Sequence, residues 1–379
     1  MNKISLLALI SSAFMAACGG GGSDSASNAG SNNNSGAGQT QPINVVFPAV
    51  PAGTSVQPTS YLNAKNFNLA PVRLPGNSWS DATVLADFKQ NGTFQLFTAR
   101  LNYDPRSSTP TSAAASTFGI YSRDPVAGNW ILETGMLDTS AGCIHPRKAA
   151  VADLNKDSIP DIVVGCHGYD ATPFPGERMY AVLSQGGGRF RVAPIPAGIG
   201  FFHNVTVADI NQDGNADIVA TDNVIASNAI RVFLGAGDGS FTEHAELAPQ
   251  VGRNRPIYTI ELVDLNNDGR PDLIMGGADN QGWPVTTTLN QGGSRVFNGG
   301  ASTVYGANSA WGIATDFVAD GPYLYVARTT DNYSGASIEQ IDLTTKASSN
   351  LKSSTAVPWT ALIVKYGGTI QSAMVGRGL

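Results

Sequence analysis

Short apolar runs separated by polar or glycine-rich turns dominate the second half of the chain. The clearest unit extends from Val263 to Met275, where two apolar runs enclose a loop of aspartate, asparagine and glycine. Apolar runs of this length between turn residues are typical of β-strands. The pattern therefore predicts a strand, a polar loop and a second strand.

The polar loop has oxygen-bearing side chains at its first, third, fifth and ninth positions. Alternate short side chains can converge on one hard cation, and the backbone carbonyl of Arg270 can add a ligand. Similar loops begin at Asp153 and Asp209, about 55 residues apart, which indicates a repeat architecture. The side-chain ligands predicted by this spacing are Asp153, Asn155, Asp157 and Asp161; Asp209, Asn211, Asp213 and Asp217; and Asp264, Asn266, Asp268 and Asp272.

Each repeat continues with a third apolar run, a glycine-rich turn and a fourth run, as in Ile230–Leu234 followed by Gly235–Gly239. Glycine-rich turns between such runs favour hairpins. About four antiparallel strands in 50 to 60 residues match one propeller blade. We therefore predict an all-β propeller of four-stranded antiparallel blades, with six blades favoured and seven as the alternative.

Weaker copies of the loop extend the series in both directions. Residues 87–95 and 316–324 keep the first aspartate and the glycine, but Lys89 and Val318 replace ligands. We interpret both as turns that keep the loop shape without the metal. At the ends, we expect 61–67 to complete the half blade formed by the hairpin that begins at Ala361, which closes the ring. The serine- and threonine-rich segment 107–116 is interpreted as a loop insertion.

The composition fits many turns and argues against several partners. Charged residues are 14% of the chain, with 43 glycines and 21 prolines. The formal net charge is −6 and no basic run is present, so we expect no nucleic-acid partner.

The N-terminus reads as a targeting segment. Lys3 precedes an apolar stretch from Ile4 to Ala17 that is too short for an ordinary transmembrane span. Met15 to Cys18 resembles a bacterial lipobox, which implies cleavage before Cys18, lipid attachment there and, with Gly19 following, the outer membrane of the cell envelope. The alternative is a plain secretory signal. Residues 1–17 are then the signal peptide, 18–42 a flexible Gly, Ser and Asn tether, and 43–379 the propeller.

Cys143 and Cys166 flank one repeat, before its first strand and after its second. An antiparallel hairpin brings these ends to the same side, and export favours oxidation. We expect a disulfide, with two partly buried free thiols as the alternative.

The loop pattern D-x-N-x-D-G-x-x-D followed by an apolar strand resembles the FG-GAP/VCBS repeats, which also occur in integrin α-subunit propellers. The resemblance implies calcium as the ion, loops that join the first two strands of each blade, and carbonyl ligands from Ile159, Asn215 and Arg270. Ser158 replaces the glycine in the first copy. The role implied for calcium is structural.

Other calcium-binding motifs with similar ligand spacing fit this sequence less well. An EF-hand needs an acid at position twelve, which here is Val164, Ala220 or Met275. A dockerin continues into a helix, whereas β-branched and apolar residues follow these loops. Metal-free Asx turns are the remaining alternative.

On the face opposite the loops we expect the segments that enter the first strands and leave the second strands. These segments hold aromatic, acidic, amide and basic side chains, a mixture suited to glycan or peptide recognition. The candidate ligand-binding residues are His145, His167, Asp170, His203, Asp222, Arg255, Asp279, Trp283 and Trp311.

The sequence thus predicts a calcium-stabilised, lipid-anchored binding or adhesion module of the cell envelope. The alternative is an exported carbohydrate-active enzyme, a polysaccharide lyase or hydrolase. Its general base would be a histidine paired with an aspartate, either His167 with Asp170 or His203 with Asp222. No catalytic motif supports it, so we assign no catalytic residue. A structural subunit of an envelope complex is a third hypothesis.

Overall fold

The computed structural model describes the chain over residues 64–68, 79–93, 95–103, 107–124, 126, 130–223, 229–251, 256–299, 302–306, 308, 310–332, 335–355, 361–366 and 369–374. The signal peptide, the tether, Cys18 and Arg255 lie outside these residues. Within the described ranges, no helix has the length and apolar character needed to cross a bilayer.

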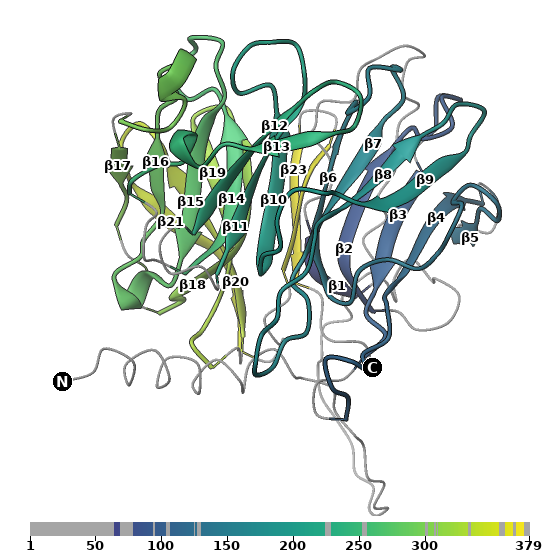
Figure 1. Cartoon of the computed structure of the whole chain (residues 1–379). Coiled ribbons are helices and arrows are strands. Elements are labelled where there is room, and N and C mark those ends of the chain that lie inside the picture. The colour runs from purple at the N-terminus through teal and green to yellow at the C-terminus, as the bar shows by residue number, and fades with distance from the viewer. Residues whose placement is uncertain are drawn as a thin grey trace, which may run out of the picture.

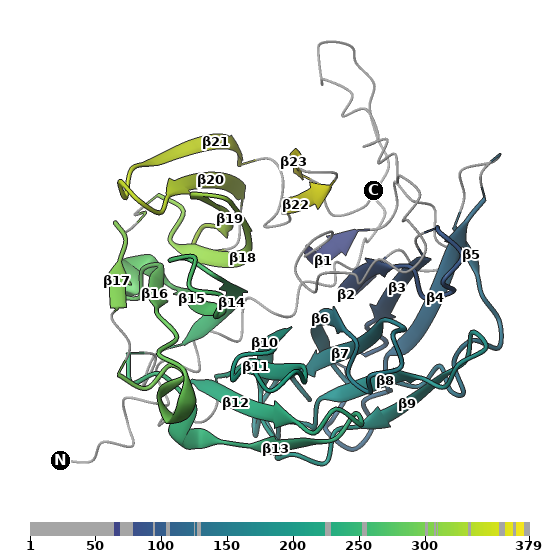
Figure 2. The same ribbon diagram turned by 90° about the horizontal axis from the view of Figure 1, so that it is seen from above.

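The described chain forms five blades arranged around an axis (Figures 1 and 2). The first blade has five strands: β1 (Ala64–Asn68), β2 (Trp79–Ala86), β3 (Gln95–Arg100), β4 (Thr117–Arg123) and β5 (Trp130–Leu132). The second blade has four: β6 (Pro146–Ala152), β7 (Asp161–Cys166), β8 (Tyr180–Ser184) and β9 (Phe190–Pro194).

The next three blades repeat the four-stranded order. Their strands are β10 (Phe202–Ala208), β11 (Asp217–Asp222), β12 (Ile230–Gly235) and β13 (Phe241–Glu243); β14 (Ile257–Val263), β15 (Asp272–Gly277), β16 (Thr286–Thr288) and β17 (Ser302–Val304); and β18 (Ile313–Asp320), β19 (Tyr323–Thr329), β20 (Ala336–Asp342) and β21 (Ser348–Ser354). All neighbouring strands pair antiparallel, which confirms the predicted blade type. The short 3-10 helices η2 (Ala245–Leu247), η3 (Asp279–Gln281) and η4 (Gly293–Arg295) lie in the connections.

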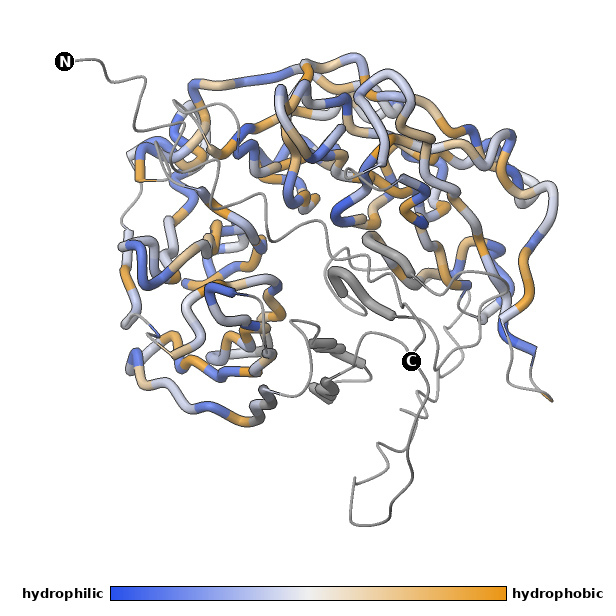
Figure 3. Tube along the Cα trace, turned by 90° about the horizontal axis from the view of Figure 1, so that it is seen from below, coloured by the Kyte–Doolittle hydropathy of each residue, from blue (hydrophilic) through white to orange (hydrophobic). Residues whose placement is uncertain are grey.

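The apolar core lies between blades. One cluster joins Val84 and Phe97 of the first blade to Ile162 and Phe190 of the second, and similar clusters join each later pair of neighbours. Apolar and polar positions alternate along the chain in Figure 3, and the apolar positions form no single continuous layer. Each blade is therefore stabilised by the blade beside it, as expected when a repeat cannot bury its apolar faces alone.

The prediction of six blades is wrong for the described residues. β22 (Ala361–Tyr366) and β23 (Thr369–Met374) form a separate two-stranded sheet between the fifth blade and β1 (Figure 2). The expected pairing of 61–67 with this hairpin is also wrong, because β1 forms its hydrogen bonds with β2. β1 thus extends the first blade on its inner edge and leaves the hairpin two-stranded.

The two weaker loop copies differ in outcome. Residues 87–93 keep the loop shape, with Asp87 accepting hydrogen bonds from Asn91 N (3.0 Å) and Gly92 N (2.8 Å). The prediction of a similar loop at 316–324 is wrong, because β18 continues to Asp320 and a tight turn follows at Gly321. Val318 and Leu324 are buried within the strands, which explains why the chain stays extended there. Residues 107–116 form the expected insertion, between β3 and β4.

Candidate functional site

The three predicted metal loops occupy equivalent places in neighbouring blades. They connect β6 to β7, β10 to β11 and β14 to β15, and each ninth position begins the second strand. The strand that follows each loop excludes the helix that a dockerin or an EF-hand would need.

The loops share one backbone conformation. Positive φ angles occur at the fourth position (Lys156 at 61°, Gln212 at 62°, Asn267 at 58°) and at the sixth position, which is glycine in two loops. Ser158 takes the sixth position of the remaining loop with φ 67°, so serine adopts a conformation that glycine reaches without a steric penalty. The first loop therefore keeps the shape of the others despite its different residue.

Hydrogen bonds within each loop orient the first and third side chains. Asp209 accepts from Asp213 N (3.1 Å) and Gly214 N (2.8 Å), and Asn211 Oδ1 accepts from Asp213 N (3.1 Å). The same bonds occur in the loops that begin at Asp153 and Asp264. Backbone donors thus orient the side-chain oxygens of positions one and three.

The ninth-position aspartates are fully buried and join two parts of the blade. Asp217 Oδ2 accepts from Ile210 N (3.0 Å) in the loop, and its Oδ1 accepts from Gly235 N (2.8 Å) at the end of β12. Asp161 and Asp272 make the corresponding pairs of bonds. Burial, with a smaller contribution from the other loop carboxylates, raises the pKa of Asp161 and of Asp217 to about 7.

The loop residues fit a hard divalent cation. The donors at each loop are carboxylate, amide and carbonyl oxygens, the set that calcium prefers. Burial and, to a smaller extent, the neighbouring carboxylates raise the pKa of the ninth-position aspartates, and a cation would offset both effects. In the third loop Arg270 forms an ion pair with Asp268, so an ion there would compete with the guanidinium for this carboxylate.

Neighbouring loops are also in contact. The fourth-position side chain of one loop donates to the sixth-position carbonyl of the next: Gln90 Nε2 to Ser158 O (2.7 Å), and Gln212 Nε2 to Gly269 O (3.2 Å). Asn290 Nδ2 adds a bond to Ile210 O (2.8 Å). The two glutamine bonds join the loop at Asp87 to the loop at Asp153, and the loop at Asp209 to the loop at Asp264.

The opposite face is shaped by β-bulges at equivalent places. The strand register shifts at Arg147 in β6, His203 in β10, Tyr258 in β14 and Thr315 in β18. Bulges turn a side chain away from the regular pleat and often lie beside functional sites. Arg147 and Tyr258 lie in the segments expected on this face but are not among the predicted ligand-binding residues, although both, like His203, lie six residues ahead of a loop aspartate.

The bulges bring polar side chains of three blades together. Arg147 Nη1 lies 3.3 Å from His145 Nε2, and its Nη2 lies 3.2 Å from His203 Nε2. Because the guanidinium can only donate, both Nε2 atoms accept, and each ring carries its proton on Nδ1. His203 Nδ1 then donates to Tyr258 O (3.2 Å), and His145 Nδ1 to Tyr103 Oη (3.0 Å). Burial and the charge of Arg147 hold the pKa of His145 well below its usual value.

We call His145, Arg147, His167, His203 and Tyr258 the axial cluster. The ring centroid of His167 lies 5.1 Å from the ring centroid of His145 and 5.2 Å from that of His203. Asp170 Oδ1 lies 3.7 Å from His167 Nδ1. The structure thus brings together four of the predicted ligand-binding residues: His145, His167, Asp170 and His203. Most of these side chains are buried.

The other predicted ligand-binding residues have different surroundings. Asp222 is buried and forms an ion pair with Arg231 (3.0 Å), and Asp279 forms one with Arg328 (2.9 Å). Both carboxylates accept backbone N–H bonds as well, which indicates structural roles. Trp283 and Trp311 are half-buried on the same face, and Trp283 packs against Tyr258.

A buried charged group lies deeper between the inner strands. Lys148 Nζ forms a 2.7 Å ion pair with Asp316 Oδ1, joining β6 to β18. Glu261 of β14 accepts from Leu262 N (3.2 Å) and Thr206 Oγ1 (3.4 Å). Burial raises the pKa of Glu261 to about 7, while Lys148 lowers it and Asp316 raises it further. No pattern in the sequence predicts that these residues lie together.

Comparison with known proteins identifies repeats in the same region. A model of the FG-GAP-like repeat matches residues 153–220 and 221–275. Human integrin alpha-7 is 26% identical over 136 residues, or 34% of this chain and 12% of that protein. Chicken (Gallus gallus) integrin alpha-6 is 33% identical over 136 residues, which cover 34% of this chain and 13% of that protein.

Bovine phosphatidylinositol-glycan-specific phospholipase D is 28% identical over 150 residues, 33% of this chain and 17% of that protein. The chain thus spans less than a fifth of the length of these relatives. Among solved structures, an exo-β-1,3-galactanase from Phanerochaete chrysosporium has a TM-score of 0.44 at 11% identity, over 82% of this chain and 70% of that chain. The chain therefore contains FG-GAP-like repeats, which commonly bind calcium, and is distantly similar to integrin α subunits.

Replacing Glu261 by glutamine should remove part of the pH dependence of stability. Its native pKa is raised from 4.5 to about 7, so its contribution to stability is full below pH 4.5 and is lost as the pH rises toward 7. Thermal unfolding between pH 5 and 8 should show a steeper fall for the wild type than for Glu261→Gln. Glu246→Gln, at an exposed site, is the matched control and should follow the wild type. Parallel curves for wild type and Glu261→Gln would contradict the assignment.

Proposed function

We propose that this protein is a calcium-stabilised binding or adhesion module of the bacterial cell envelope. In this proposal a lipid on Cys18 anchors the chain, and the face opposite the loops recognises a glycan or protein ligand. The observation that carries it is the set of three loops with one conformation and one oxygen donor set on a single face. The repeats matched at 153–275 support calcium as the ion.

Calcium would be held by the carboxylate and amide side chains of each loop and by the carbonyls of Ile159, Asn215 and Arg270. Its chemical contribution when bound is positive charge among converging carboxylates. The protein's own residues position the donors: the backbone N–H groups orient positions one and three, and the buried ninth aspartate fixes the loop to the third strand. This role is structural, because a calcium ion enclosed by protein oxygens would not activate a water molecule for catalysis.

The double substitution Asp213→Ala with Asp268→Ala should lower the unfolding temperature in calcium and leave it unchanged in excess chelator. The reason is mass action, since an ion that binds the native state stabilises it by about 2.7 kcal/mol at one hundred times its dissociation constant. Differential scanning calorimetry of both proteins in both media makes the test. Asp238→Ala, in an exposed turn outside the loops, is the control and should respond to calcium like the wild type. An equal loss in both media would show that these aspartates act without an ion.

The ligand face favours binding over catalysis. The axial cluster and the adjacent Asp170 have the His, Arg and carboxylate groups that the alternative, a carbohydrate-active enzyme, would need. However, His145 is 2% exposed, Arg147 5% and His167 1%, so a polymer could not reach these three side chains directly. The half-buried Trp283 and Trp311 instead offer an aromatic rim beside polar groups, an arrangement suited to sugars or peptides.

A glycan and peptide array probed with the full chain should identify a ligand whose binding depends on this rim. Trp283→Ala and Trp311→Ala should each weaken that binding by about tenfold, as expected for an aromatic anchor. Tyr323→Ala is the control, because Tyr323 is 38% exposed and follows the β18–β19 turn on the opposite face. If the three variants bind alike, the ligand does not use this face.

Cys18→Ser should release the protein from the membrane fraction. The substitution removes the thiol that would carry the lipid and leaves the propeller intact, so the chain should fractionate with soluble proteins. Cell fractionation and radiolabelled fatty-acid incorporation measure the two effects. Membrane retention of Cys18→Ser would place the anchor elsewhere in the chain.

A further inference from the structure

We propose that His145, His167 and Asp170 form a second metal site that takes a divalent transition metal of the zinc class. One ligand atom from each of these side chains lies within 4.8 Å of the other two. Two imidazoles and one carboxylate are a donor set found in zinc sites, whereas calcium prefers oxygen donors throughout. The site lies on the face opposite the calcium loops and is independent of them.

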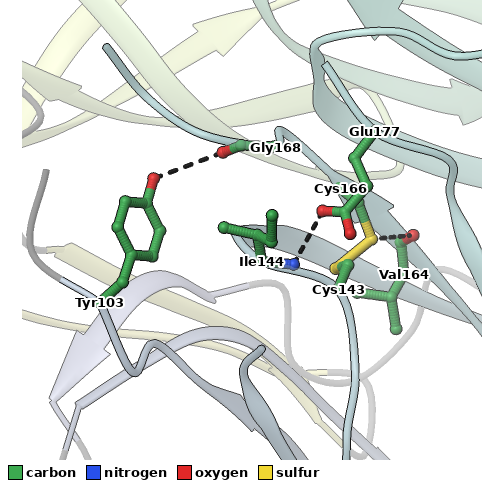
Figure 4. The surroundings of a disulfide bond; sticks show 7 residues. All are labelled: Tyr103, Cys143, Ile144, Val164, Cys166, Gly168 and Glu177. Carbon is green, nitrogen blue, oxygen red and sulfur yellow. Dashed lines mark hydrogen bonds between the residues drawn. A yellow bond between two sulfur atoms is a disulfide. The ribbon is translucent and has the colours of Figure 1, made fainter. Parts of the chain in front are cut away.

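The fold holds the two histidines next to each other. His145 precedes β6 and His167 follows β7, and a disulfide between Cys143 and Cys166 joins the same two segments with a Cα–Cα distance of 6.1 Å (Figure 4). The backbone N–H of His167 donates to His145 O (2.8 Å). The two rings are thus positioned by a covalent link and a backbone bond that do not depend on a metal.

A half-buried carboxylate fixes the His145 segment further. Glu177 Oε2 accepts from Ile144 N at 2.7 Å, directly before His145 (Figure 4). The backbone of Glu177 also pairs with Gly200, on the chain that leads into β10. Outer contacts of this kind hold metal ligands in place and reduce the ordering cost of binding.

A tight turn returns Asp170 to the histidines. Gly168 has φ 76°, and a side chain there would lie 2.6 Å from the backbone carbon of Gly176, so the position requires glycine. Asp170 N then donates to Tyr103 Oη (2.9 Å), and Tyr103 Oη lies 3.0 Å from His145 Nδ1. This places the carboxylate beside both rings, with Asp170 Oδ1 3.7 Å from His167 Nδ1.

The distances require only a small closure. Zinc bonds of about 2.0 to 2.1 Å in tetrahedral geometry set the ligand atoms about 3.3 Å apart. The present spread of up to 4.8 Å can be closed by side-chain rotation. Three protein ligands leave one position for water or for the Tyr103 hydroxyl.

The position of Arg147 determines which ring nitrogen of His145 can bind the ion. Its guanidinium lies at the Nε2 edge (3.3 Å) and repels a cation there, so the metal approaches Nδ1. Binding at Nδ1 moves the ring proton to Nε2, and Arg147 then loses one acceptor but keeps His203 Nε2 at 3.2 Å. Arg147 therefore weakens the site, and removing its charge should strengthen metal binding.

The test is a zinc titration of the full chain in detergent, prepared without a polyhistidine tag and stripped of metal. A chromophoric chelator competes for zinc in excess calcium, which saturates the loops. We expect one equivalent of zinc per chain, and we expect His167→Ala and Asp170→Asn to lower the affinity by about a hundredfold or more. Arg147→Gln should raise the affinity several-fold. Cobalt should give visible ligand-field absorption in the wild type that His167→Ala lacks.

His244→Ala is the matched control, because His244 is exposed, forms an ion pair with Glu246 (2.8 Å) and should leave zinc binding unchanged. Asp170→Asn conserves size, and its calcium-dependent unfolding temperature verifies that the variant is folded. Zinc affinity that is equal in wild type, His167→Ala and Asp170→Asn would overturn the proposal, as would the absence of binding to the wild type. Neither result bears on the calcium loops, because calcium saturates them throughout.

Discussion

The second, third and fourth blades each depend on one buried carboxylate. Asp161, Asp217 and Asp272 each accept one hydrogen bond from the loop and one from a backbone N–H at or just beyond the end of the third strand. Each carboxylate holds three segments together with its two oxygens: the second strand in which it lies, the loop, and the end of the third strand. The arrangement is costly while the buried aspartate stays charged near other carboxylates, and a cation bound in the loop would offset this cost.

Contacts between neighbouring loops connect adjacent blades. Gln90 and Gln212 each reach the loop of the next blade, and the apolar clusters also lie between blades. Stability in such an array is shared by neighbours, so ordering one loop favours order in the next. The loop that begins at Asp87 takes part through its shape, which Asp87 holds by accepting hydrogen bonds from the backbone N–H groups of Asn91 and Gly92.

Sequence reasoning located the loops, their flanking strands and the cysteine pair because local chemistry determines them. Alternating oxygen side chains around a glycine have few other uses, and β-branched residues beside them select strands. It failed where partners are distant. Asp316 resembles the start of a loop, yet it lies within β18 and pairs with Lys148 of another blade. β1 was assigned to the wrong neighbour for the same reason, since strand pairing across a ring has no local signal.

The bulges of the four inner strands have a consequence for how this protein can change. The bulged residue is skipped by the hydrogen-bond ladder, so its identity is nearly free of the requirements of the sheet. Arginine, histidine, tyrosine and threonine occupy the equivalent place in successive blades whose loops are close copies in three cases. Repeats that are constrained to be alike at one rim can therefore diverge at the axis, and a new specificity can arise by single substitutions without any redesign of the ring.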